Sequence, residues 1–211
     1  MVSLTKIGEY GIAYCEDLET INIPDNVTEI GRFAFANSDL ETVTFGAGSK
    51  LNRLAAYSFA GSGIREITVP ANVSTAAQYA FAGCQRLERV TFAENSKLTS
   101  IGAYMFDGCD MLQSIRFNPG SALTAVQAHG LEGMDQLTEV DFGDAKLTEI
   151  GNFAFRFCAS LQNVSLPESL TNIGRYAFYG CESLSTVVFH SYYAPVLEGT
   201  ITGQEIEITP D

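Results

Sequence analysis

The sequence lacks tryptophan and has only two histidines in 211 residues, which leaves few groups for acid–base chemistry. Its 12 basic residues face 25 acidic ones, a formal net charge of −13. Nucleic acids and anionic lipids need a basic footprint, so we expect neither as a partner. No run of about 18 apolar residues is present, so membrane insertion is not expected. Phosphate-loop, zinc-protease and serine-hydrolase motifs are also missing, and the sequence therefore predicts neither an enzyme nor a cofactor.

The sequence does contain a repeat that covers most of the chain. Each unit has an apolar anchor and a second large apolar residue five positions later. In all units but one, an aromatic residue stands three positions after the anchor. A unit of this length cannot bury its own apolar face, so the units must stack into a solenoid with one continuous core. The anchors lie 22 to 25 residues apart: Ile7, Ile30, Leu54, Ala76, Ile101, Val126, Ile150 and Ile173.

Each unit closes with a pattern of the type Leu-x-x-Val-x-Phe, in which apolar residues alternate with period two. This pattern predicts one short strand per unit and hence a parallel sheet along the solenoid. The aromatic residues after the anchor predict a short helical turn. We therefore expect an α/β solenoid of about eight repeats over residues 1–189, beginning in the middle of a repeat. Residues 190–211, where the pattern stops, are expected to form a degenerate cap or a linker.

The unit that starts at Ile150 resembles the BspA-like leucine-rich repeat, whose pattern is approximately I-G-x-x-A-F-x-x-C-x-x-L-x-x-V-x-L-P-x-x-L-T. The matching residues are Ile150-Gly151, Ala154-Phe155, Cys158, Leu161, Val164, Leu166-Pro167 and Leu170-Thr171. The resemblance extends over about residues 4–189. It implies a right-handed, curved solenoid whose parallel sheet lines the concave side. It also implies a bacterial or other microbial protein that is secreted or attached to the cell surface and acts in adhesion or protein recognition without catalysis.

The N-terminus shows no charged segment followed by an apolar one, so this segment carries no signal peptide. Residues 4–8 correspond to the second half of a unit such as 147–151. We therefore expect the chain to be part of a longer protein whose targeting signal lies elsewhere. An extracellular or cell-surface location is what the resemblance implies.

Several residues belong to types that take part in catalysis or metal binding, but each has a structural interpretation. His129 stands where seven other units have an aromatic residue, which predicts a ring packed in the core. The acidic residues of the sixth unit could in principle bind calcium, but a solvated acidic face fits their spacing better: Glu132, Asp135, Glu139, Asp141 and Asp144.

All cysteines fall eight positions after an anchor, which predicts a buried ladder of small side chains and no metal site: Cys15, Cys84, Cys109, Cys158 and Cys181. Their odd number and common orientation favour free thiols, although neighbouring pairs are close enough for disulfides.

The candidate binding residues flank the central apolar residue of each strand, because side chains alternate between the two faces of a sheet. Eight strands at about 4.8 Å give a face roughly 35 to 40 Å long, enough for a protein partner such as a host or matrix protein. Its middle alternates between acidic and basic residues, and arginine is enriched in binding hot spots. The predicted site comprises Glu66, Thr68, Arg89, Thr91, Ser114, Arg116, Glu139 and Asp141.

Other interpretations of this face remain open. It can be passive, with threonine suiting exposed strand positions and the charges pairing across neighbouring strands. The module can then be a structural spacer that presents another domain, or a carbohydrate- or calcium-binding accessory module. The sequence leaves the oligomeric state open.

Overall fold

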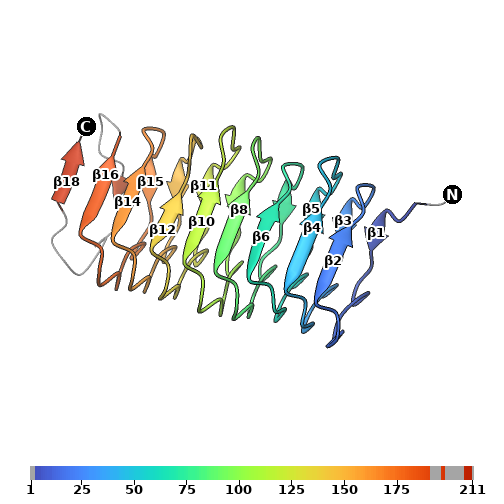
Figure 1. The fold of residues 1–211 in the computed structure, drawn as a ribbon. Coiled ribbons are helices and arrows are strands. Elements are labelled where there is room, and N and C mark those ends of the chain that lie inside the picture. Colours follow the sequence, from blue (N-terminus) through green and yellow to red (C-terminus); the bar gives the residue numbers. More distant parts are fainter. Residues whose placement is uncertain (1–2, 191–195, 198–206, 211) are drawn as a thin grey trace.

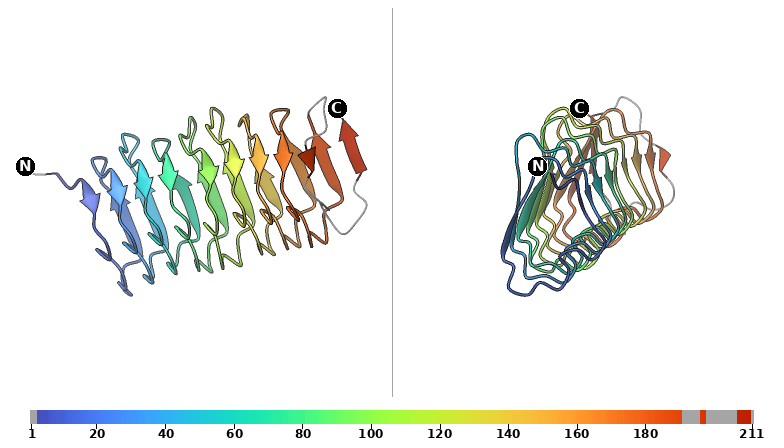
Figure 2. Two further views of the ribbon diagram at one scale, coloured as in Figure 1. Left: turned by 180° about the vertical axis from the view of Figure 1, so that it is seen from behind. Right: turned by 90° about the vertical axis from the view of Figure 1, so that its right-hand side faces the viewer.

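The computed structural model describes residues 3–190, 196–197 and 207–210. The chain winds into a parallel β-solenoid in which each unit contributes one short and one long strand (Figure 1). The right-hand view of Figure 2, turned by 90° from Figure 1, shows the units stacked one behind the other. The described residues contain no helix, so the predicted helical turns and the α/β class are wrong. The prediction of about eight stacked units with parallel strands is confirmed.

Two series of strands alternate along the chain. The short strands are β1 (Lys6–Ile7), β3 (Glu29–Ile30), β5 (Arg53–Leu54), β7 (Thr75–Ala76), β9 (Ser100–Ile101), β11 (Ala125–Val126), β13 (Glu149–Ile150), β15 (Asn172–Ile173) and β17 (Val196–Leu197). The long strands are β2 (Thr20–Ile23), β4 (Thr42–Phe45), β6 (Glu66–Val69), β8 (Arg89–Phe92), β10 (Ser114–Phe117), β12 (Glu139–Asp141), β14 (Asn163–Leu166), β16 (Thr186–Phe189) and β18 (Glu207–Pro210). We call the outer surface of the long strands the long-strand face.

Equivalent residues of successive units stand beside one another in both series. Ile7 is the register partner of Ile30, and Ile67 that of Val90. The short strands form two ladders that are interrupted between β7 and β9. β17 and β18 each continue a ladder by one strand. The predicted cap or linker over 190–211 otherwise lies outside the described residues, and the boundary at residue 189 stays a prediction.

The core is one column of stacked apolar side chains between the two strand series. The rings five positions after the anchor are fully buried and stack on one another, as Phe35 does on Phe59 at 5.1 Å between ring centroids. Apolar residues of both strand series pack around this column in a single cluster. The continuous core that the repeat predicts is therefore confirmed.

The segment between the short and the long strand has a backbone that a helix cannot adopt. The residue three positions after each anchor has a left-handed conformation, for example Tyr57 with φ +59°. The seventh position is left-handed too, as at Gly61 with φ +67°. A helix needs consecutive residues near φ −63°, so these residues interrupt it. Instead, N–H groups donate to carbonyls of the next unit, as from Phe35 to Ser58 at 2.8 Å.

The long-strand face is interrupted at two places. β4 and β6 are register partners only at Thr42 and Glu66, and β12 and β14 belong to separate sheets (Figure 1). By contrast, β2 pairs with β4, and β6 with β8, over four residues. We call the opening between β4 and β6 the first seam and that between β12 and β14 the second seam.

A proline follows the second long strand at each seam. At three joints where the long strands pair over four residues, the residue after the second strand donates its N–H to the preceding unit, as from Ala93 to the Val69 carbonyl at 3.1 Å. Pro70 follows β6 and Pro167 follows β14, and proline has no N–H to donate. The ladder therefore loses its closing hydrogen bond at the two joints where the strands separate.

Candidate binding surface on the long strands

The structure places all eight predicted site residues on the long-strand face. Each is exposed or half-exposed, and the apolar residues between them, such as Ile67 and Val90, are buried. The alternation that the sequence predicts for these strands is therefore confirmed. Their role in binding remains a prediction.

Two clusters of charge lie on this face, one at each end of the predicted site. Arg89 contacts Glu66 of the neighbouring strand, with 3.0 Å between Nη2 and Oε2, and Glu88 beside it in sequence at 3.2 Å. The hydrogen bond to Glu66, and then its charge, raise the pKa of Arg89. Arg116 lies 3.4 Å from both Glu139 and Asp141. Such exposed ion pairs contribute about 0–1 kcal/mol, so a partner can replace them at little cost.

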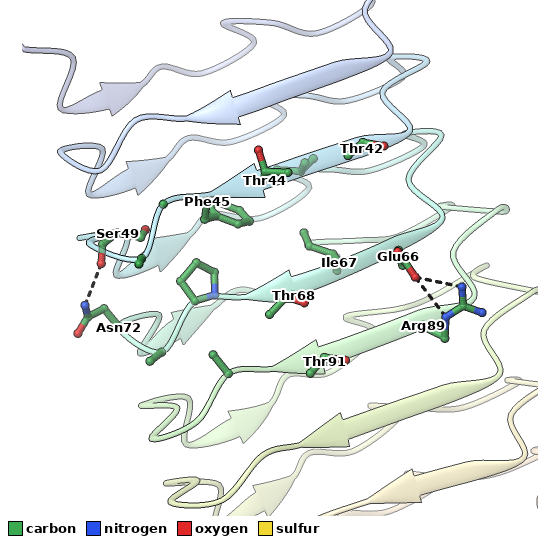
Figure 3. A pocket seen from close by; sticks show the side chains of 16 residues that line it. Thr42, Thr44, Phe45, Ser49, Glu66, Ile67, Thr68, Asn72, Arg89 and Thr91 are labelled. Carbon is green, nitrogen blue, oxygen red and sulfur yellow. Dashed lines mark hydrogen bonds and ion pairs between the residues drawn. The ribbon is translucent and has the colours of Figure 1, made fainter.

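A groove of about 600 Å³ lies at the first seam. Figure 3 shows it over β4 and β6, with the Glu66–Arg89 pair at one end and Asn72 near the other. Asn72 is held there by a hydrogen bond of 2.9 Å from its Nδ2 to the Ser49 carbonyl. The apolar lining residues are Val43, Phe45, Ile67, Pro70, Ala47, Ala71 and Ala93.

Phe45 is the side chain that the seam uncovers. The residue at this position is buried in each of the other seven units, with an exposed fraction of 6% or less, whereas Phe45 is half-buried. Since β6 separates from β4 after Thr42, the next strand no longer covers this ring. The groove thus combines an apolar floor with polar groups at its rim, which is the usual composition of a ligand site.

The groove brings together half of the predicted site. Glu66, Thr68, Arg89 and Thr91 line it. The other four residues lie further along the face, in β10 and β12, and do not line it: Ser114, Arg116, Glu139 and Asp141. Sequence reasoning missed Phe45, because the repeat assigns that position to the core. The available signal was Pro70 directly after a long strand.

The cysteines are structural, as predicted. All five are free, and four are buried. The thiols of the four buried cysteines donate to carbonyls of another unit, as Cys84 Sγ does to the Phe59 carbonyl at 3.0 Å and Cys158 Sγ to the Leu131 carbonyl at 3.1 Å. Burial, and then a hydrogen bond with the Cys181 thiol, hold the pKa of Cys158 well above its usual value. A protonated, buried thiol is a poor nucleophile and metal ligand.

The prediction that His129 lies in the core is wrong. The third-position rings form a continuous surface stack, in which His129 lies 4.8 Å from Tyr104 and 5.0 Å from Phe153 between ring centroids. The ring is half-buried and contacts Glu132, whose other oxygen lies 3.2 Å from Arg156. The third position has the same left-handed backbone in every unit, so His129 stands in line with the other third-position rings. The third position is thus a surface aromatic ladder.

The carboxylates of the sixth unit do not converge on one point. Glu132 contacts His129 and Arg156, Asp141 contacts Arg116, and Asp144 accepts a hydrogen bond of 2.8 Å from the Gly120 N–H. Within the described residues, no group of three or more metal-ligating side chains is found. No helix long and apolar enough to cross a membrane occurs in that part of the chain either.

Comparisons with known proteins define the class of this repeat. The profile of the BspA type leucine-rich repeat region matches residues 5–118 and 94–196 in six copies. The chain therefore belongs to the BspA-type leucine-rich repeat family. No match is found among curated proteins.

Two solved leucine-rich repeat proteins with TM-scores above 0.5 share the fold. A leucine-rich repeat protein of Bacteroides ovatus is 24% identical with a TM-score of 0.56, and the match covers 89% of this chain and 59% of that one. The Treponema pallidum leucine-rich repeat protein is 27% identical with a TM-score of 0.52, over 68% of this chain and 72% of that one. A leucine-rich cell surface protein of Faecalibacterium prausnitzii is 19% identical with a TM-score of 0.43, over 86% and 62%. The chain thus spans about three fifths of the Bacteroides protein.

Proposed function

We propose that this chain is a non-enzymatic recognition or adhesion module of a secreted or cell-surface microbial protein, and that it binds a protein partner on the long-strand face. The observation that carries the proposal is the groove at the first seam, because four of the eight predicted site residues line it. The half-buried ring of Phe45 toward one end of the groove and the exposed Arg89 at the opposite end are residue types that recur in binding interfaces.

The charge pattern of the face supports a partner with both acidic and basic groups. Arg89 and Arg116 are about half-exposed, with side-chain exposures of 52% and 55%, and both lie within networks of exposed carboxylates. A partner can replace these ion pairs with ion pairs between the arginines or carboxylates and its own charged groups. Such contacts change the association rate and the specificity more than the stability of the complex.

The test is binding of the complete 211-residue chain to immobilised extracellular-matrix proteins, with a glycan array in parallel. Arg89→Glu and Arg116→Glu should each weaken binding about tenfold or more, because like charges then meet across the interface. Arg53→Glu is the matched control. Its side-chain exposure of 55% equals that of Arg116, but Arg53 lies in β5 among the short strands. Equal affinity of all three variants would contradict the proposal, and no binding to any probe would favour a structural spacer.

A carbohydrate-binding module is the second candidate, and exposed aromatic rings are the observation that favours it. Phe157, Tyr176 and Tyr179 are 41 to 44% exposed and contact one another edge to face through Tyr179. They lie in the turn segments and not on the long-strand face. Glycan binding that is lost in Tyr179→Ala and kept in Arg89→Glu would support this alternative.

A further inference from the structure

The first seam leaves main-chain groups that the sheet does not use. Beyond the pair Thr42 and Glu66, the facing edges of β4 and β6 have no register partners, although both strands are fully paired on their other sides. The Val69 carbonyl, at the same position one unit later, faces the next unit and accepts the Ala93 N–H. By equivalence the Phe45 carbonyl faces β6, where Pro70 has no N–H to offer.

The second seam lacks this feature although it has the same cause. There the Phe142 carbonyl accepts a hydrogen bond of 3.1 Å from the Ala145 N–H. The Gly143 N–H donates to Asp141 Oδ1 at 2.9 Å, and the Phe142 side chain is only 4% exposed. The loop after β12 therefore satisfies its own polar groups and covers its own ring. The first seam has an uncovered ring and a carbonyl without an equivalent donor.

We propose that the groove at the first seam binds an extended peptide segment of the partner protein. The segment would lie along β4 and β6 and hydrogen-bond through its main chain to the unused edge groups near Phe45 and Thr68. Strand addition of this kind supplies affinity through the main chain and specificity through side-chain pockets. An apolar side chain of the segment would rest on Phe45. The Glu66–Arg89 pair would accept a polar or charged residue at the other end of the groove.

The chemistry of the groove favours a peptide over the other ligand classes. Its edge groups alternate donors and acceptors at strand spacing, which another main chain matches. Phe45 is the one aromatic ring in the lining, which provides little surface for stacking sugars. The inference deepens the proposed function and rests on it, because it names the part of the partner that enters the long-strand face.

The test uses Pro70→Ala, which restores an N–H opposite the Phe45 carbonyl and should close the seam. The probe is a phage-displayed library of random 12-residue peptides, selected on the wild-type chain. Selected peptides should bind Pro70→Ala and Phe45→Ala at least about tenfold more weakly, because each variant removes part of the site. The matched control is Pro167→Ala, the same substitution at the second seam, which should leave peptide affinity unchanged.

Each result decides the proposal. Peptides that bind Pro70→Ala as tightly as the wild type would overturn it, and so would the failure of the library to give any binder. Amide hydrogen exchange gives a readout without a ligand, since Phe45 and Thr68 should exchange more slowly in Pro70→Ala than in the wild type. A failed peptide test would not by itself contradict the proposed function. If a partner protein bound Pro70→Ala normally but did not bind Arg89→Glu, the long-strand face would remain the binding surface and the inserted peptide would be excluded.

Discussion

The two seams share a sequence cause and differ in what they expose. Each has a proline after the second long strand, so each lacks the closing hydrogen bond that Ala93 makes to Val69. At the second seam the loop folds back on itself, with Ala145 and Asp141 supplying the missing donor and acceptor. At the first seam the segment from Phe45 to the next short strand is one residue longer than the segment from Phe142. It contains Gly46 and Gly48, which lie so close to Asp25 that a Cβ on either would come within 3 Å of its carboxylate. The comparison shows that a broken ladder produces a groove only where the following loop leaves it open.

The largest expected difference concerns the two phenylalanines. Phe142→Ala should lower the free energy of unfolding by about 3–5 kcal/mol, because it removes a buried ring and leaves a cavity. Phe45→Ala should lower it by only ~1–2 kcal/mol, since that ring is already partly in water. Urea unfolding followed by circular dichroism measures both. Equal losses would show that Phe45 is as much a part of the core as Phe142.

A third seam should form when a proline is introduced after β8. Ala93→Pro removes the N–H that bonds the Val69 carbonyl at 3.1 Å and should lower the free energy of unfolding by about 1–3 kcal/mol. Hydrogen exchange of the Val69 and Thr91 amides should become faster. Ala93→Gly keeps the N–H and serves as the control. If hydrogen exchange stayed unchanged in the proline variant, proline would not be the cause of the existing seams.

The smallest effect is expected from the arginines beside the seams. Arg89→Ala and Arg116→Ala should each change the free energy of unfolding by less than about 1 kcal/mol, because their ion pairs are exposed. The change should shrink further in about 1 M salt, where such pairs are screened. Thermal unfolding at low and high salt tests this. A loss well above 1 kcal/mol in either variant would mean that the charges hold the face together and are not available to a partner.

The sequence predicts much of this fold because the repeat links local pattern to position. The anchors at Ile30 and Ile150 and the alternation around Val90 identify the strands, the core and the outward residues correctly. The helical turn was wrong, because aromatic residues three and five positions after an anchor suit a helix as well as the observed left-handed turn. Only the stacking of successive units, which pairs Phe35 with Ser58, decides between the two.

The candidate site was predictable only in part. The outward direction of Glu66 and Arg89 follows from strand alternation, but the groove between their strands depends on a hydrogen bond that Pro70 cannot make. Proline is common in this repeat, but Pro24 follows β2, and no earlier long strand is present whose pairing with β2 it could interrupt within the described residues. The effect of a proline depends on the neighbouring unit and on the loop beside it. Neither is visible in a single unit of the repeat.

The turn segments between the short and the long strands give the stack of units a polarity. In most units their N–H groups at the third, fifth and seventh positions donate toward the following unit, as from Phe153 to Arg175, Phe155 to Ala177 and Phe157 to Tyr179. A duplicated or deleted unit therefore fits the row without any change to its neighbours, provided that it keeps the same orientation. Two such rows that meet at like ends would oppose donors with donors or carbonyls with carbonyls. The architecture thus permits the protein to change length by whole units and excludes joining through this ladder in the reverse sense.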